Sequence, residues 1–118
     1  DLRRSLSEAK AAGVADENIV LDIGIGFGKT LEQNLELIAK LDRLVGEFDP
    51  YPILVGTSRK SFIGRILGDA PPTERLGGSI ASALIAIQKG ARIVRVHDVK
   101  ETVGAIKMAA AIAGETKI

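Results

Sequence analysis

The sequence contains no cysteine and no tryptophan, and it has one tyrosine, three phenylalanines and a single histidine, His97. Without cysteine the chain cannot form a disulfide framework or a thiolate metal site, and nothing in it points to an oxidising compartment. Aromatic residues make up only 3% of the chain, so its core must come from Leu, Ile, Val and Ala. The apolar fraction of 46% is ordinary for a soluble globular protein.

The chain also has no large excess of positive or negative charge. The 16 basic and 15 acidic residues give a formal net charge of +1, and Lys and Arg form no dense block, which argues against nucleic acid or an anionic membrane as a partner. No apolar run approaches the ~20 residues of a membrane span. The N-terminus, Asp1–Ser5, starts like the middle of a helix rather than a signal peptide. We therefore expect a cytoplasmic protein in which residues 1–118 form one small domain or part of one.

Hydrophobic patterns divide the chain into alternating helices and strands. Short continuous apolar runs, typical of strands covered on both faces, predict strands at residues 19–22, 53–56 and 91–97. Apolar residues at helical spacing predict helices over residues 2–12, 31–45, 61–67, 72–89 and 102–113. Gly13 and Gly90 fit the ends of two of these helices.

Strands that alternate with helices of these lengths imply a parallel sheet with right-handed crossovers. Three strands alone would leave two bare edges and a thin core, and the chain opens on a helix without the strand that should precede it. Both observations suggest a segment of a larger α/β fold. Because polar side chains end each of the three strands, whereas a doubly wound sheet concentrates them near one switch point, the pattern favours a (β/α)-barrel.

These polar side chains lie in three stretches, Asp22–Thr30, Gly56–Ser61 and Arg95–Asp98. If the three strands are parallel neighbours, the stretches meet at one end of the sheet, where α/β proteins place their active sites. Together they would supply a carboxylate, several cations, an imidazole and backbone opened by glycine. Such a set suits an anionic substrate with hydrogen-bonding groups.

The first stretch resembles two nucleotide-binding motifs but fits neither. Lys29 stands where the third glycine of G-x-G-x-x-G should be, and Ile23 stands where a phosphate-binding P-loop needs its first glycine. A flexible strand-to-helix turn and a binding loop based on Asp22 remain as alternatives. A carboxylate that ends a buried strand needs a partner, and a substrate edge with several N–H donors would satisfy it.

The other two stretches each allow a structural as well as a functional interpretation. Lys60 and Ser61 precede a short helix whose N-terminus favours an anion, but the Ser61 hydroxyl could instead cap that helix and Lys60 could be solvated. Strand alternation places Arg95 and His97 on one face. The pair would make a phosphate clamp, although a lone histidine at a strand end is more often structural.

The three stretches, extended by Glu74–Ser79, resemble the C-terminal part of the dihydropteroate synthase family. The resemblance covers nearly the whole chain. It rests on four segments: Asp22–Thr30, Val55–Gly64, Glu74–Ser79 and Arg95–Val99. It implies a TIM-type (β/α)₈ barrel, of which residues 1–118 would be a partial pterin-binding domain with three parallel strands and covering helices. It also implies folate biosynthesis, in which 7,8-dihydropterin-6-ylmethyl pyrophosphate is condensed with p-aminobenzoate and pyrophosphate is released. Sulfonamides compete for the aminobenzoate site of that family.

The same resemblance implies roles for individual residues. The catalytic residues would be Lys60, Arg95 and His97. The pterin would be bound by Asp22, Gly56, Lys60 and Arg95, the pyrophosphate by Arg95 and His97, and the aminobenzoate by Gly26, Phe27 and Ser61. No residue of this chain is expected to bind a metal directly, because Mg²⁺ would arrive with the pyrophosphate and find its protein ligand in the family's N-terminal part. Cations at the pyrophosphate would stabilise the negative charge that develops there, and no nucleophilic side chain is needed.

The chain departs from the family in two respects. Ile23 stands where the family usually has proline, and the family's first strands, with their ligands for pterin and magnesium pyrophosphate, are absent. A full barrel has about 250 residues, so these 118 residues should be inactive unless the remainder is supplied.

Two other functions remain as alternatives. A pterin-binding domain of a methyltetrahydrofolate-dependent methyltransferase would share the barrel but would hold no pyrophosphate. The second alternative is an interaction module without enzymatic activity. The small residues of the predicted helix 72–89, such as Gly77, Gly78 and Ala81, could form a homodimer interface, as is common in the family, or could pack on the chain's own barrel.

Overall fold

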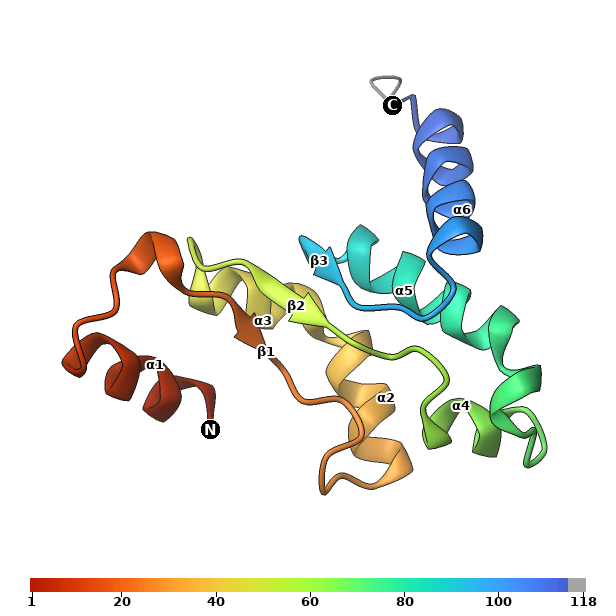
Figure 1. Ribbon diagram of the computed structural model, residues 1–118, viewed down its shortest axis with the longest axis horizontal. Helices are drawn as coiled ribbons and strands as arrows, with labels where there is room; N and C mark the ends of the chain where they lie inside the picture. The colour runs from red at the N-terminus through yellow and green to blue at the C-terminus, as the bar shows by residue number, and fades with distance from the viewer. Residues whose placement is uncertain (115–118) are drawn as a thin grey trace.

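The computed structural model describes residues 1–114 and contains a three-stranded sheet with helices (Figure 1). The helices are α1 (Leu2–Ala11), α2 (Leu31–Ala39), α3 (Leu41–Phe48), α4 (Ser61–Ile66), α5 (Leu76–Gln88) and α6 (Val99–Ile112), with 3₁₀ turns η1 (Asp16–Asn18) and η2 (Pro72–Glu74). The strands are β1 (Leu21–Asp22), β2 (Ile53–Val55) and β3 (Ile93–Val94). Within residues 1–114, every helix is too short or too polar to cross a bilayer.

The strands are parallel and lie in the order β1-β2-β3. Asp22 pairs with Leu54, and Leu54 pairs with Ile93. The ladder continues past β3, because the backbone N–H of Arg95 donates to the carbonyl of Val55 at 3.1 Å. The carboxyl ends of all three strands therefore point in one direction, and the loops that follow them share one edge of the sheet.

Side-chain alternation gives the sheet one covered and one uncovered face. The covered face packs on helices that lie behind the sheet in Figure 1, and its core contains Leu21, Ile38, Leu41, Phe48, Ile53, Val55 and Ala86. On the other face Ile93 is 40% exposed, and Asp22 and Arg95 are also exposed. A doubly wound sheet carries helices on both faces, so this one-sided cover is the arrangement of a segment of a (β/α)₈ barrel, with the uncovered face toward the barrel axis.

The predicted alternation of helices and strands is confirmed, but several boundaries were wrong. The strands are shorter than predicted, and the helix predicted over residues 31–45 is two helices that meet at Lys40, where φ is −107° and ψ is 20°. The predicted helix start at Pro72 is a separate 3₁₀ turn before α5. The last helix begins at Val99 rather than Thr102, because the Asp98 carbonyl accepts hydrogen bonds from both the N–H and the hydroxyl of Thr102.

Candidate active site

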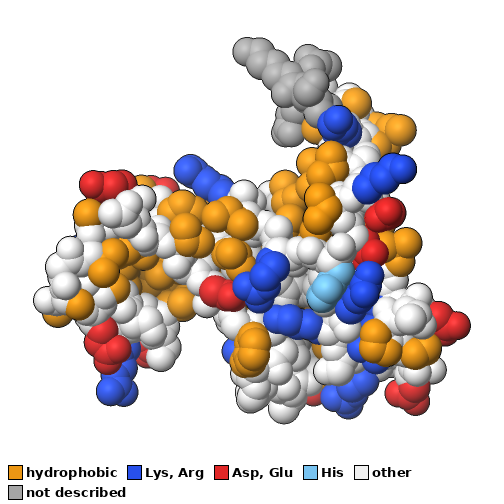
Figure 2. Space-filling model, viewed as in Figure 1, with side chains coloured by type: hydrophobic (Ala, Val, Ile, Leu, Met, Phe, Trp, Pro, Cys, Tyr) orange, Lys and Arg blue, Asp and Glu red, His pale blue; other side chains and the backbone are white. Residues whose placement is uncertain are grey.

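The loops after the three strands bring the predicted carboxylate, cations and imidazole together. Arg95 Nη1 donates to Asp22 Oδ2 at 3.2 Å, and Lys60 Nζ donates to the carbonyl oxygen of Ile25. A hollow of about 240 Å³ is lined by Gly56, Ser58, Lys60, Arg95, Val96 and His97. Figure 2 shows Lys and Arg side chains gathered around the histidine on this face. Since pockets for small molecules usually enclose ~300–1,000 Å³, the hollow has the size of part of a binding site.

Asp22 ends β1 with both carboxylate oxygens engaged. Oδ1 accepts a hydrogen bond from the N–H of Gly24 at 2.9 Å, while Oδ2 accepts from Arg95. The side chain is 42% exposed, so this carboxylate is not buried as the sequence suggested. A ligand that donates to Asp22 would share Oδ2 with Arg95 or displace the guanidinium from it.

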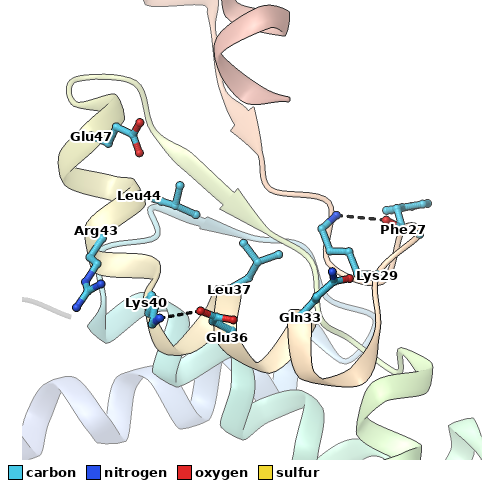
Figure 3. A pocket seen from close by; sticks show the side chains of 10 residues that line it. Phe27, Lys29, Gln33, Glu36, Leu37, Lys40, Arg43, Leu44 and Glu47 are labelled. Atoms are coloured by element: carbon cyan, nitrogen blue, oxygen red, sulfur yellow. Dashed lines mark hydrogen bonds and ion pairs between the residues drawn. The ribbon is translucent and has the colours of Figure 1, made fainter.

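The glycine loop, residues 23–29, is braced from two sides. The Oδ1 atom of Asn34, a buried side chain of α2, accepts from the N–H of Gly26 at 2.8 Å. Lys29 Nζ donates to the carbonyl oxygens of Gly24 at 2.7 Å and Phe27 at 3.2 Å, and Figure 3 shows the second of these bonds. The segment is a turn between β1 and α2, and these hydrogen bonds hold it in place.

Lys60 reaches from the loop after β2 across to the glycine loop. Besides its bond to Ile25, its ammonium lies 4.9 Å from the centre of the Phe27 ring, within the range of a cation–π interaction. At Gly26, φ is +89° and a Cβ would lie 3.2 Å from Lys60 Cδ, so a side chain there would be strained and crowded. Lys60, Gly26 and Phe27 thus lie side by side, as the predicted site requires.

Ser61 has no structural role in capping α4. Lys60 is the N-cap residue of that helix, and no side chain accepts a capping hydrogen bond there. The Ser61 hydroxyl is exposed and makes no hydrogen bond within residues 1–114. The capping alternative was therefore wrong, and the proposed contact with a ligand stays a prediction.

Gly56 makes room for Arg95. A Cβ on Gly56 would lie 2.6 Å from Nη2 and 3.0 Å from Cζ of Arg95, so the guanidinium rests directly on the glycine backbone. Arg95 and His97 both lie on the uncovered face, as strand alternation predicted, and His97 Nδ1 is 2.9 Å from the hydroxyl oxygen of Ser58. The structure therefore places Gly56, Arg95 and His97 around the same hollow.

The site has an excess of positive charge that acts on Lys60. Partial burial lowers the pKa of the Lys60 ammonium, and the nearby positive charges of Arg95 and Lys29 lower it further. The carboxylate of Asp22 opposes this shift by raising the pKa. Because only the charged form attracts an anion, we expect ligand affinity to fall as the pH rises through this lowered pKa, below the usual lysine value of ~10.4.

Replacing Arg95 by methionine should raise the pKa of Lys60, because a positive neighbour that disfavours the ammonium is removed. The ¹³Cε shift of Lys60 can be followed against pH in the complete protein, with the resonance identified by its loss in Lys60→Arg. Arg92→Met, which removes an exposed charge at the other end of β3, is the control and should leave the titration unchanged. An unchanged Lys60 pKa in Arg95→Met would contradict the proposed coupling.

Sequence reasoning missed several residues that hold these loops. Asn34 could have been found, because it interrupts the apolar stripe of Leu31, Ile38 and Leu41, and a polar residue on such a stripe needs a partner. Leu35, which shares the helical spacing of these apolar residues, is 40% exposed. Ser58 gave no comparable signal, since its partner His97 is 39 residues away in the sequence.

A larger hollow of about 650 Å³ lies beside α2 and α3 (Figure 3). It includes Phe27 and Lys29 of the glycine loop, but much of its remaining lining is charged and already paired. Lys40 Nζ lies 2.7 Å from Glu36, and Glu47 is paired with Arg3 of α1. The smaller hollow, where Lys60, Arg95 and His97 converge from the loops after β2 and β3, is the better candidate for an active site. Residues 1–114 contain no group of three His, Asp or Glu side chains that could hold a metal ion.

Comparisons with known proteins agree on one family. The sequence profile of the family described as "Pterin binding enzyme" matches residues 1–97. A curated dihydropteroate synthase of Clostridium beijerinckii is 55% identical over 109 residues, which are 92% of this chain and 39% of that protein.

Solved structures show the same likeness in three dimensions. A dihydropteroate synthase of Coxiella burnetii in complex with pteroic acid superposes with a TM-score of 0.87 at 42% identity, covering 94% of this chain and 40% of that one. A Yersinia pestis dihydropteroate synthase in a sulfonamide drug complex gives a TM-score of 0.87 at 44% identity, covering 96% of this chain and 40% of that one. The chain thus spans about two fifths of the length of these proteins.

Proposed function

The chain belongs to the pterin-binding enzyme family, and from this we propose that it supplies part of the active site of a dihydropteroate synthase. The reaction would join 7,8-dihydropterin-6-ylmethyl pyrophosphate to p-aminobenzoate and release pyrophosphate, which makes the complete protein a transferase of a pterin-methyl group. The observation that carries this proposal is the convergence of Asp22, Lys60, Arg95 and His97 on the edge of one parallel sheet. The relatives named dihydropteroate synthase support the same activity.

The proposed chemistry follows from the charges of these side chains. Asp22 would accept hydrogen bonds from N–H groups on the pterin edge, and Lys60 would donate to the pterin's polar atoms. As the bond between the pterin methylene and the pyrophosphate oxygen breaks, negative charge builds up on the departing oxygen. Arg95 and His97 would stabilise that charge, which lowers the barrier without a nucleophilic side chain. The aniline nitrogen of p-aminobenzoate would then attack the electron-poor methylene carbon and afterwards lose a proton.

The aminobenzoate would lie over the glycine loop. The Phe27 ring is 70% exposed and sits next to Lys60, so it offers an aromatic surface for the ring of the substrate. Ser61, with its unbonded hydroxyl, and the backbone of Gly26 would border the same molecule. We expect sulfonamides to compete at this position.

We further propose that Mg²⁺ enters with the pyrophosphate and is held by phosphate oxygens and by a residue outside this segment. Both oxygens of Asp22 already accept hydrogen bonds from Gly24 and Arg95, so this carboxylate is poorly suited to a metal. Hard cations such as Mg²⁺ are commonly bound through substrate phosphates with only one or two protein carboxylates.

We also propose a cytoplasmic homodimer that uses the outer faces of α2, α4 and α5. An apolar hollow of about 450 Å³ lies between these helices, and Leu35, Ile66, Leu67 and Ile85 around it are exposed. Small residues of α5 line this hollow, among them Gly78, and they also allow close packing within the chain. A Cβ on Gly78 would clash with Ile63 Cγ2, so Gly78 serves packing within the chain.

The activity can be tested on the complete protein that contains this segment. With the pterin pyrophosphate, Mg²⁺ and labelled p-aminobenzoate, it should form dihydropteroate and release pyrophosphate, whereas residues 1–118 alone should form none because the remaining site residues are missing. Competition by a sulfonamide against aminobenzoate is the control. No product from well-folded complete protein would refute the proposal. Tight methyltetrahydrofolate binding that ignores pyrophosphate would indicate a methyltransferase, and absence of pterin binding in calorimetry would indicate an interaction module.

A further inference from the structure

The hydroxyl of Ser58 lies against His97 and contacts it twice. Ser58 Oγ accepts a hydrogen bond from the backbone N–H of His97 at 3.1 Å, and it lies 2.9 Å from the ring nitrogen Nδ1. Ser58 is only 6% exposed, while His97 lines the hollow together with Lys60 and Arg95. The serine is therefore placed behind the imidazole, on the side of Nδ1.

The position of Ser58 is fixed by its neighbours on both sides. The buried Thr57 hydroxyl lies 2.8 Å from Ser82 Oγ of α5. The N–H of Arg59 donates to Ser79 Oγ at 2.8 Å, and the Arg59 guanidinium donates to Asp98, which follows His97, at 2.8 Å. Because the loop is anchored at the residues before and after it, Ser58 cannot move away from the ring without breaking these bonds.

The Ser58 hydroxyl has a single proton, and where that proton points determines which ring nitrogen of His97 carries the hydrogen. A serine hydroxyl has one proton to donate and two lone pairs that accept. One lone pair already accepts from the His97 backbone, and within residues 1–114 the only remaining partner of the hydroxyl is Nδ1. If Nδ1 of a neutral ring carried the hydrogen, the buried serine proton would have no acceptor among residues 1–114, which is unfavourable. This balance favours a serine proton that points to Nδ1 and a ring hydrogen on Nε2.

We propose that Ser58 is a positioning residue that holds His97 as the Nε2–H tautomer, so that the imidazole is a hydrogen-bond donor toward an anion in the hollow. The hydrogen bond made by one ring nitrogen generally sets the role of the other. That the anion is a pyrophosphate group rests on the proposed function, whereas the tautomer itself does not. If Ser58 had a purely structural role, it would connect the loop after β2 to the backbone of His97. It would then have no effect on which ring nitrogen of His97 carries the hydrogen.

The tautomer can be read by ¹⁵N NMR of histidine-labelled complete protein in alkaline buffer, where imidazole side chains are neutral. His97→Gln identifies the resonances. Wild-type protein should show Nε2–H alone, and Ser58→Ala should show a mixture of the two tautomers. Ser79→Ala, which removes another buried hydroxyl that anchors the same loop without touching His97, should keep Nε2–H alone. A single unchanged Nε2–H tautomer in Ser58→Ala would overturn the proposal.

A second measurement tests whether the tautomer matters for anion binding. Titration with inorganic pyrophosphate should show about fivefold to tenfold weaker binding in Ser58→Ala, the usual effect of one lost hydrogen bond. In the His97→Gln background, Ser58→Ala should have no further effect, because Ser58 acts through the ring. An equal loss in both backgrounds would overturn the positioning role. If wild-type protein does not bind pyrophosphate, the proposed function fails, and the NMR result alone decides the role of Ser58.

Discussion

Replacing Arg95 by methionine is expected to lower kcat/KM of the complete protein about 10²–10³-fold, the usual loss when one preorganised donor to a developing oxyanion is removed. Arg95 bonds to Asp22 at 3.2 Å and lines the hollow with Lys60 and His97. Its side chain is 53% exposed, so the substitution should change the melting temperature little. Steady-state kinetics with both substrates, together with thermal unfolding, would separate the catalytic effect from loss of fold.

Gly56→Ala offers a test that keeps the charge but moves it. The added methyl group would lie 2.6 Å from Arg95 Nη2 and would push the guanidinium out of its place. A displacement of about 1 Å can cost ~10²-fold in rate, so Gly56→Ala should lose activity.

For Arg95→Met, the matched control is Arg92→Met, which removes a charge just before β3 and should keep its activity. Turnover within a few-fold of wild type in Arg95→Met would remove Arg95 from the catalytic set.

Lys60→Met is expected to have a similarly large effect, about 10²–10³-fold in kcat/KM, but with a second component. The ammonium donates to the Ile25 carbonyl and lies 4.9 Å from the Phe27 ring centre, so its loss also releases the glycine loop. We therefore expect KM for p-aminobenzoate to rise along with the fall in kcat. The measurement is a full kinetic analysis with each substrate varied in turn.

Lys29→Met is the matched control for Lys60. Lys29 also braces the glycine loop through the carbonyls of Gly24 and Phe27, but it does not line the hollow. If Lys60 acts on the substrates, Lys60→Met should lower kcat much more than Lys29→Met does. Equal effects of the two substitutions would show that Lys60 serves only to hold the loop.

Much of the arrangement around the hollow could be predicted because it follows from strand periodicity. Once β3 is recognised as a strand, a period of two residues puts Arg95 and His97 on one face, and parallel neighbours bring Asp22 and Gly56 to the same edge. Both the burial pattern and the contact between Gly56 and Arg95 agree with this reasoning. The choice of a barrel over a doubly wound sheet also followed from the sequence, since polar residues end every strand.

The bracing of the loops could not be predicted, because it depends on contacts between distant segments. Arg59 and Asp98 are 39 residues apart, and nothing in their local sequence shows that they form an ion pair. The break between α2 and α3 at Lys40 carries neither glycine nor proline, so helical periodicity ran straight through it. The sequence did not show that Asp22 would also accept a hydrogen bond from Arg95, which the strand order brings near.

The alternation of side chains along β3 also limits where the chain can change length during evolution or engineering. Adding or deleting one residue between Ala91 and Arg95 would exchange the two faces of the strand, turning Arg95 toward the helices and Val94 toward the hollow. A length change there would therefore remove the charge from the site even if every residue type were kept. Insertions should be tolerated at the exposed turn residues Gly68 and Asp69, where no strand alternation has to be preserved.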